Sequence, residues 1–557
     1  MNVRIRCRWI WAACVVTLIG GALRFWGLTR LDLWFDENCT YYIEHHFFHW
    51  PISGPDRWLE VAHIPYYFLL SLWTSLVGET AWGLRSFSAL TGTLTIPLMA
   101  IVATRLAGRR VGIVAAILTA LHPLHIHYSQ EARVYTFWAL VSLGVMYALL
   151  SAVRFGRRNG WFLFCVFAWL LVLTHSYALL LLPATACAVF AARTRGRALK
   201  QWVIACASLG LLLVPAVVWL VIPQAARGPK TWLAEVWQES PGFSAVARSI
   251  WTMMPAGSYP HYLGGLGGWE RALRFQGGVV LAGIVEVGPA MVVAGLVAVC
   301  LFARGRGRSG EAVGAVETNR DSAGDVFHIT VALAAIVFCF LFTAMIYSYI
   351  AGPAYVVGRY DFVAFPAAVI ATAGVIETAS RKLCKTRRGR LIAVAVIVGF
   401  LAGSSLITTL ASRNVDPAQR SQARAEVISA HVDPHDLVIS VNQYRWFLTY
   451  EWSRRGFAAS VVSFPAAHAA QICWRDPVAE LADPNKLETD AETTVARVLA
   501  ALRDGGRAWM VTQGRPETPE FRVDRILYAK LVSRGIEIRP VDDWSGLAEL
   551  TLVTLEQ

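Results

Sequence analysis

Long apolar runs recur along the first three quarters of the chain, separated by short polar connections. Each run is long enough, or nearly long enough, to cross the ~30 Å hydrocarbon core of a bilayer as a helix. The pattern predicts a mainly helical, polytopic membrane protein with about eleven transmembrane helices. The predicted spans are Trp9–Leu23, Ser86–Thr104, Val111–Leu124, Val134–Val153, Trp161–Leu173, Tyr177–Ala192, Trp202–Ile222, Gly277–Ala303, Val326–Ile346, Phe362–Ile376 and Leu391–Leu410.

The pattern changes after Leu410, where charged residues of both signs appear and no spanning run follows. Short runs rich in β-branched residues predict strands, with helical stretches between them. We expect a membrane domain over residues 1–410 and a small α/β domain over 411–557. The expected strands are Leu437–Val441, Ala508–Thr512 and Ile536–Val541, and the expected helices are Ala423–Ala430 and Val523–Ser533.

Composition agrees with this division. Apolar residues make up 56% of the 557 positions and charged residues only 16%, against about 25% charged in an average soluble domain. A single soluble core stops growing near ~250–300 residues. The composition therefore excludes a soluble enzyme and a disordered chain.

The net charge of +13 is confined to the membrane part. Residues 411–557 hold 17 basic and 20 acidic residues, or −3, which leaves 34 basic and 18 acidic residues, or +16, for the first 410 positions. Basic residues prefer cytoplasmic loops, and eleven spans with the N-terminus inside bring every cluster to that side. The charge therefore indicates topology and not nucleic-acid binding. The clusters are Arg4/Arg6/Arg8, Arg109/Arg110, Arg154/Arg157/Arg158, Arg193/Arg195/Arg197/Lys200, Arg304/Arg306/Arg308 and Arg381–Arg390.

The predicted topology helps to interpret the segment Ile64–Val77 and the N-terminal segment. The apolar segment Ile64–Val77 has only about 14 residues, short for a span. Counting it as a span would move Arg109/Arg110 and every later cluster outside, so we expect an interfacial or re-entrant helix on the outer face. The N-terminal basic and apolar segment lacks a small-residue cleavage site, and we expect a retained membrane anchor. An odd number of spans makes the C-terminal domain extracytoplasmic in the cell membrane.

Polar residues gather in the connections predicted to face outward, and ionisable groups at membrane depth tend to be functional. Taken singly, each motif has a simpler explanation. Asp36 and Glu37 can be a general base or a metal-binding anion, but also the capped start of a helix. Glu131 and Arg133 can be an ion pair at a helix mouth, and His63 an interfacial residue. Arg359 is suited to bind phosphate, because guanidinium contacts phosphate oxygens bidentately. The remaining outer candidates are His175 and Tyr360.

The order and spacing of these motifs carry a resemblance. They are Leu33-Trp-Phe-Asp36-Glu37, His63-x-Pro-Tyr-Tyr, Leu84-Arg85-Ser86-Phe87-Ser88-Ala89-Leu90, Tyr128-Ser-Gln-Glu131-Ala-Arg133-x-Tyr135, Thr174-His175-x-Tyr177 and Gly358-Arg359-Tyr360. Over about residues 5–410 the chain resembles the GT-C membrane glycosyltransferases. The resemblance is to the protein mannosyltransferase and aminoarabinose transferase group, and closest to its bacterial galacturonosyltransferase-like branch.

The resemblance implies transfer of a sugar from a polyprenyl-phosphate donor to a glycan, lipid or protein acceptor at the outer membrane–water interface. It implies that Asp36 is the general base, supported by Glu37. Positive charge near the departing phosphate would stabilise it, with Arg359 as the first candidate and Arg133 as the second. Arg85 is either a further cation or a structural residue. Glu131 would pair with Arg133 or orient the sugar, and His63, His175 and Tyr360 would line the donor site.

The sequence implies no required cofactor. A divalent metal at Asp36 and Glu37 is compatible with the pattern, but two adjacent carboxylates specify neither metal nor geometry. The main alternative is a transporter or flippase of lipid-linked saccharides, which needs polar residues in mid-membrane; Glu286 and His328 are the candidates within spans. A scaffold whose outer domain binds a partner is the third reading. Cys39 and Cys473 are the cysteines expected outside, and their spacing does not show whether they pair.

Overall fold

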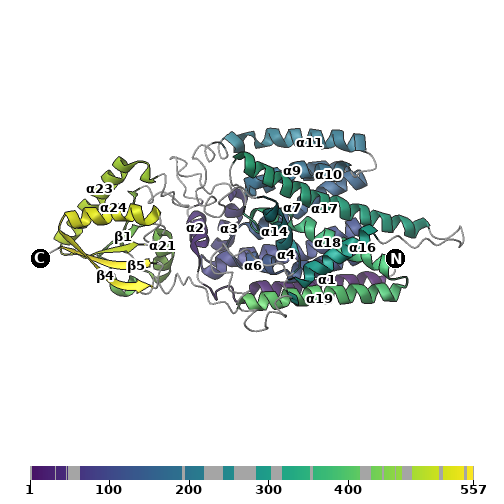
Figure 1. The fold of residues 1–557 in the computed structure, drawn as a ribbon, viewed down its shortest axis with the longest axis horizontal. Coiled ribbons are helices and arrows are strands. Elements are labelled where there is room, and N and C mark those ends of the chain that lie inside the picture. The colour runs from purple at the N-terminus through teal and green to yellow at the C-terminus, as the bar shows by residue number, and fades with distance from the viewer. Residues whose placement is uncertain are drawn as a thin grey trace.

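The computed structural model describes residues 3–31, 33–45, 47, 63–190, 195–218, 222, 242–255, 284–285, 287–302, 317–351, 356–413, 428–441, 444–457, 459–466, 480–512, 519–544 and 548–555. The molecule is elongated, with a helical bundle at one end and a domain containing a β-sheet at the other (Figure 1). Glu286, Cys473 and residues 423–427 lie outside the described residues. The mainly helical fold with a small α/β domain is as predicted.

As far as their residues are described, the predicted spans lie on helices or on consecutive helices. In chain order the bundle contains α1 (Val3–Phe25), α2 (Phe35–His45), α3 (Ile64–Val77), α4 (Ala81–Ala107), α5 (Arg109–Leu121), α6 (Pro123–Ser129), α7 (Tyr135–Phe155), α8 (Arg158–Thr174), η3 (Ser176–Leu180), α9 (Leu181–Ala184), α10 (Ala186–Phe190), α11 (Arg195–Ala216), α14 (Phe243–Met253), α16 (Gly288–Phe302), α17 (Glu317–Ala351), η5 (Tyr360–Ala364), α18 (Phe365–Leu383) and α19 (Arg387–Arg413).

Fewer helices in the structure are long and apolar enough to span a membrane than the sequence predicted. Among the described residues, 6 helices are long and apolar enough to cross a membrane, or up to 7 if α5 and α6, bent by 59°, form one span. Proline explains part of the difference, because it cannot donate the backbone hydrogen bond of a helix interior. Pro123 opens α6 after the break, and Pro183 lies in the series of short helices that replaces one predicted run. The count of eleven stays a prediction.

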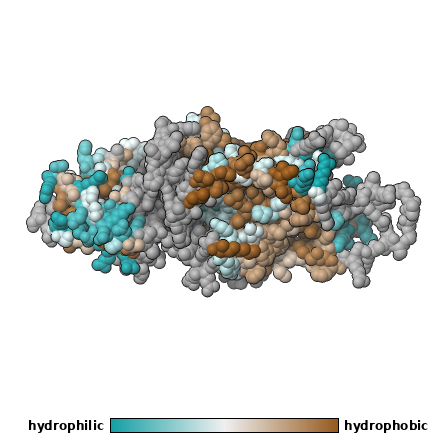
Figure 2. Space-filling model, turned by 90° about the horizontal axis from the view of Figure 1, so that it is seen from above, coloured by the Kyte–Doolittle hydropathy of each residue, from teal (hydrophilic) through white to brown (hydrophobic). Residues whose placement is uncertain are grey.

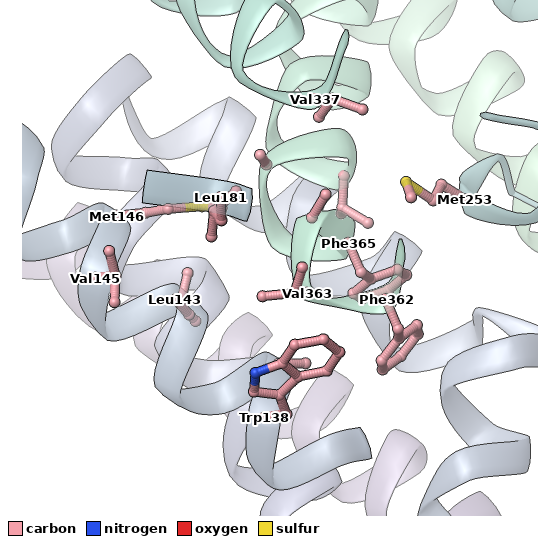
Figure 3. Packing of buried hydrophobic residues seen from close by; sticks show 14 of the residues in the cluster. Trp138, Leu143, Val145, Met146, Leu181, Met253, Val337, Phe362, Val363 and Phe365 are labelled. Carbon is pink, nitrogen blue, oxygen red and sulfur yellow. The ribbon is translucent and has the colours of Figure 1, made fainter. Parts of the chain in front are cut away.

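The bundle core packs directly against the polar residues that the sequence analysis singled out. Figure 3 shows Trp138 of α7 close to Val363 and Phe362, at the start of the α18 segment. Trp138 and both η5 residues are fully buried, and the Ser142 hydroxyl donates to the Val363 carbonyl at 2.6 Å. These contacts fix η5 against α7.

The C-terminal domain contains a five-stranded sheet in the order β2-β1-β3-β5-β4. Strands β1 (Leu437–Val441), β2 (Ser460–Phe464) and β3 (Ala508–Thr512) are parallel, whereas β5 (Ala548–Leu555) pairs antiparallel with β3 and with β4 (Ile536–Trp544). Strands β1 and β3 have the predicted bounds, and β4 begins at the predicted residue. The domain's helices are α21 (Tyr444–Arg455), α23 (Pro484–Arg503) and α24 (Pro519–Ser533).

Helix α2 is held between the two parts of the molecule. On one side the Tyr41 ring meets the Tyr450 ring of α21 edge-on at 4.9 Å, and the Tyr41 hydroxyl donates to Ser453 at 3.4 Å. On the other side α3, which has the predicted bounds, holds the last turn of α2. The Ser71 hydroxyl donates to the Glu44 carbonyl at 3.0 Å, and Thr74 donates to the Glu44 carboxylate.

The buried Glu44 carboxyl predicts a pH dependence of stability. Burial is the main reason that its pKa is raised to about 7. The Thr74 hydrogen bond lowers the pKa, and the negative charge of Glu79 raises it further. Because the folded state then binds this proton more tightly than the unfolded state does, Glu44 lowers stability as pH rises from 4.5 towards 7. Glu44→Gln should raise the melting temperature of the purified protein at pH 8 but not at pH 5. Glu488→Gln, at an exposed site, is the control, and a pH-independent effect of Glu44→Gln would contradict the assignment.

Candidate active site

Asp36 lies in the first turn of α2, between two arginines from distant parts of the chain. Its side chain is only 3% exposed. Nη2 of Arg359 lies 2.6 Å from Oδ2 of Asp36, and Nη2 of Arg133 lies 3.8 Å from the same oxygen. Arg133 also donates to the Asp36 carbonyl at 3.2 Å. The structure thus brings together one carboxylate and the two cations predicted to bind phosphate.

Glu37 has different surroundings, although it is the next residue. Both of its oxygens accept from Arg85, at 2.7 and 2.6 Å. The backbone N–H groups of Ala132 and Trp34 donate to the same carboxylate at 2.7 and 3.2 Å. Arg85 in turn donates to the Leu28 carbonyl at 2.6 Å. Glu37 therefore ties the start of α2 to α4 and to the turn before α7, and Arg85 is its structural partner.

The loop before η5 presents Arg359 to Asp36. Gly358 has a φ of 78°, in the left-handed region that favours glycine. Its N–H donates to the Asp361 carboxylate at 3.0 Å, and the Tyr128 hydroxyl donates to its carbonyl. Nε of Arg359 donates to the Tyr135 hydroxyl at 2.6 Å. The hydrogen bonds of the Gly358 N–H and carbonyl hold the loop, and the Tyr135 hydroxyl holds the guanidinium itself.

Aromatic rings enclose the same guanidinium. Its central carbon lies 5.5 Å from the Tyr135 ring centre and 5.8 Å from the Trp34 ring centre. Both distances are within the range of cation–π attraction. The sequence analysis quoted Tyr128 and Tyr135 within a motif but gave them no role. The two tyrosines lie on different helices, α6 and α7, so helical periodicity could not have indicated that both act here.

Glu131 contacts a histidine and not the predicted arginine. Its Oε1 lies 3.1 Å from Nε2 of His127. Burial alone would raise the pKa of the Glu131 carboxyl, but His127, Arg359 and Arg133 together outweigh burial and hold that pKa below its usual value. Glu131 therefore remains an anion close to both arginines. The alternative of a Glu131–Arg133 pair is replaced by a Glu131–His127 pair.

A second cluster combines His63, His175 and Tyr360, the three residues predicted to line the site. The His175 ring lies 5.1 Å from His63 and 5.0 Å from Tyr360 between ring centres. Trp138, which sequence reasoning missed as a site residue, stacks on His175 at 4.7 Å. Since Tyr360 directly follows Arg359, this cluster adjoins the Asp36–Arg359 pair.

Hydrogen bonds orient both imidazole rings. Nδ1 of His63 lies 2.5 Å from the Thr174 carbonyl and donates to it. Nδ1 of His175 accepts from the Tyr177 N–H at 3.2 Å, which leaves the proton of the neutral ring on Nε2. Three buried polar atoms nearby have no hydrogen-bond partner among the described residues, namely Trp34 Nε1, Asn38 Oδ1 and Trp138 Nε1. Buried donors and acceptors are normally satisfied, so these atoms are suited to a polar ligand.

The metal alternative finds little support in this geometry. Asp36 and Glu37 each contact a different arginine. Within the described part of the chain, no group of three or more His, Cys, Asp or Glu side chains gathers as a metal site requires.

Comparison with known proteins supplies the class of enzyme. Residues 64–219 match the family model of dolichyl-phosphate-mannose-protein mannosyltransferases, and no curated protein matches the chain. The fold is similar to ArnT from Cupriavidus metallidurans bound to undecaprenyl phosphate, with a TM-score of 0.53, 13% identity, and coverage of 99% of this chain and 98% of that one. The Archaeoglobus fulgidus oligosaccharyltransferase, in complex with Zn and sulfate, has a TM-score of 0.44 at 12% identity, over 81% of this chain and 62% of that one. The galacturonosyltransferase-like branch stays a prediction, but the chain is a membrane glycosyltransferase with the GT-C fold.

Proposed function

We propose that this glycosyltransferase moves a sugar from a polyprenyl-phosphate donor to a glycan, lipid or protein acceptor of the cell envelope. The observation that carries the proposal is the 2.6 Å contact between Asp36 and Arg359. A carboxylate that can act as a base lies beside a cation that can bind phosphate, at the outer end of the bundle. The undecaprenyl phosphate bound to the structurally similar ArnT supports this class of donor.

Arg359 binds the donor phosphate in this proposal. A guanidinium group matches two phosphate oxygens at once, and the Tyr135 hydroxyl holds Nε so that the group keeps its orientation. Arg133, whose Nη2 lies 3.8 Å from the same Asp36 oxygen, adds a second positive charge. Both charges stabilise the phosphate as it gains negative charge in the transition state, so the proposed chemistry requires no metal.

Asp36 acts as the general base. Its carboxylate accepts the proton of the acceptor hydroxyl while the acceptor oxygen bonds to the anomeric carbon of the donor sugar. The bond between that carbon and the phosphate oxygen breaks, and the electron pair leaves with polyprenyl phosphate. Asp36 then releases the proton to solvent. Glu37 supports this step as a positioning residue, because it fixes the first turn of α2 through Arg85 and Ala132.

The donor phosphate also activates the base. In the structure, Oδ2 of Asp36 accepts from Arg359, so this oxygen is engaged and cannot at the same time accept the proton of the acceptor hydroxyl. When phosphate binds Arg359, it competes with Asp36 for the guanidinium and frees the carboxylate for the acceptor. Donor binding therefore precedes removal of the acceptor proton.

The histidine and aromatic cluster receives the donor sugar. His63, His175 and Tyr360 line this part of the site, and Glu131 orients a sugar hydroxyl. The unsatisfied Trp34 Nε1, Asn38 Oδ1 and Trp138 Nε1 are further hydrogen-bonding groups for the sugar. Binding the sugar would satisfy groups that are otherwise costly to bury.

The first prediction from the proposed function concerns topology. The basic clusters predict a cytoplasmic N-terminus and an extracytoplasmic C-terminal domain, which is also the side of the proposed site. Alkaline phosphatase fused after Gln557 should be active, and green fluorescent protein fused there should be dark. Fusions truncated after Arg390, on the predicted cytoplasmic side, should give the opposite result. A fluorescent fusion after Gln557 would contradict the orientation.

The second prediction concerns the base. Asp36→Asn keeps the size of the side chain and an oxygen that can accept from Arg359, but it removes the basic carboxylate. Transfer should fall by about 100-fold or more, as loss of general-base catalysis typically does, whereas donor binding should persist. Mass spectrometry of the product formed by purified, folded protein measures transfer. Asp504→Asn in the C-terminal domain is the matched control, and full transfer by Asp36→Asn would show that another group is the base.

The third prediction separates the two substrates. Arg359→Ala should weaken donor binding by about 10-fold or more, since a hydrogen bond to a charged group is worth about 1.5–3 kcal/mol. The acceptor KM at saturating donor should change little. Arg359→Lys keeps the charge but not the bidentate geometry, so its donor affinity should lie between those of wild type and Arg359→Ala. Arg497→Ala, at an exposed position, is the control. Equal losses for donor and acceptor would count against the phosphate role.

A further inference from the structure

A cavity far from the proposed site opens between α8 and α11 on the side of the bundle. Its volume is about 620 Å³. Helix α11 lies along the edge of the bundle in Figure 1, and Figure 2 shows this part of the surface as mostly hydrophobic. The lining is almost entirely apolar, and we call this cavity the lateral groove. Its residues are Trp161, Phe162, Cys165, Val166, Trp169, Gln201, Ile204, Ala205, Ser208 and Leu212.

The dimensions of the lateral groove fit one leaflet of a bilayer. Its lining on α11 extends from Gln201 to Leu212, about 16 Å at the helical rise of ~1.5 Å per residue. Half of a ~30 Å hydrocarbon core is about 15 Å. The groove therefore has the length of a single acyl chain lying in one leaflet.

Positive charge marks one end of the groove. The Trp161 indole donates to the Gln201 side chain at 2.9 Å and closes this end. Arg197 precedes Gln201 by four residues on α11, so it lies on the same helix face one turn further out. Arg157 is the residue directly before α8. Lys200 adjoins Gln201. All three basic side chains are exposed, and none forms an ion pair with a carboxylate in the described part of the chain.

We propose that the lateral groove binds an anionic phospholipid. Arg157, Arg197 and Lys200 receive the phosphate headgroup, Trp161 lies at the level of the membrane interface, and an acyl chain occupies the groove. Basic pockets between helices on the cytoplasmic side favour anionic lipids, and this end of α8 and α11 carries two of the clusters predicted to be cytoplasmic. The proposal does not depend on the proposed catalytic function.

The basic end of the groove lies far from the proposed position of the donor phosphate. The site residue His175 directly follows α8 at its other end. Trp161 and His175 are 14 residues apart, about 21 Å along a helix. A lipid whose phosphate lies on Arg359 cannot also have that phosphate at the basic end of the groove. The occupant therefore has its own headgroup, in the opposite leaflet.

Native mass spectrometry of the purified protein tests this proposal, with phosphatidylglycerol as the probe and phosphatidylcholine as the neutral comparison. Wild type should retain phosphatidylglycerol at least about 10-fold better than phosphatidylcholine. R157Q/R197Q/K200Q should lose this preference. K385Q/R387Q/R388Q removes the same charge from exposed positions before and at the start of α19 and should keep the preference. Ser208→Trp, which fills the groove and leaves the charges, should reduce phosphatidylglycerol binding.

Three outcomes would overturn the proposal. Equal retention of the two phospholipids by wild type would show that the charge at the groove recognises no headgroup. Equal losses in the two triple variants would show a general effect of surface charge. Displacement of phosphatidylglycerol by polyprenyl phosphate in wild type, absent in Ser208→Trp, would identify the donor lipid as the occupant.

Discussion

The site depends on one buried ion pair, between Asp36 and Arg359, which brings together residues 323 positions apart. Removing one partner of a buried pair leaves an uncompensated charge, at a cost of about 3–5 kcal/mol. The surrounding structure therefore has to hold both partners. Glu37 and Arg85 fix the Asp36 side, while Gly358, Tyr128 and Tyr135 fix the Arg359 side. These contacts hold the two partners in place.

The same arrangement explains why adjacent carboxylates have different roles. Glu37 is fully buried, and its oxygens accept hydrogen bonds from a guanidinium and two backbone N–H groups, so its environment is complete without a substrate. Asp36 contacts cations that a phosphate would also bind. In the proposed mechanism, competition for Arg359 links donor binding to the release of a base. Helix α2 can serve this exchange because α3 and α21 hold it from two sides.

Periodicity predicted much of the fold, and the order of polar motifs predicted which residues meet. The strands Leu437–Val441 and Ala508–Thr512 and the helix Ile64–Val77 have the bounds that their sequence patterns indicated. Which side chains contact each other was harder to predict from the sequence, because it depends on how far each side chain reaches between helices. Glu131 contacts His127 within its own turn, and Trp138 joins the site through stacking on His175. Apolar tryptophan in a membrane helix carries no signal that separates packing from ligand contact.

The central claim is that donor phosphate takes Arg359 from Asp36. A structure of the protein with bound polyprenyl phosphate tests it most directly. We expect phosphate oxygens within hydrogen-bond distance of the Arg359 guanidinium, and the distance between Asp36 Oδ2 and Arg359 Nη2 should increase from 2.6 Å to beyond 4.0 Å, the limit of an ion pair. Phosphate bound elsewhere, with the Asp36–Arg359 pair intact, would contradict the account.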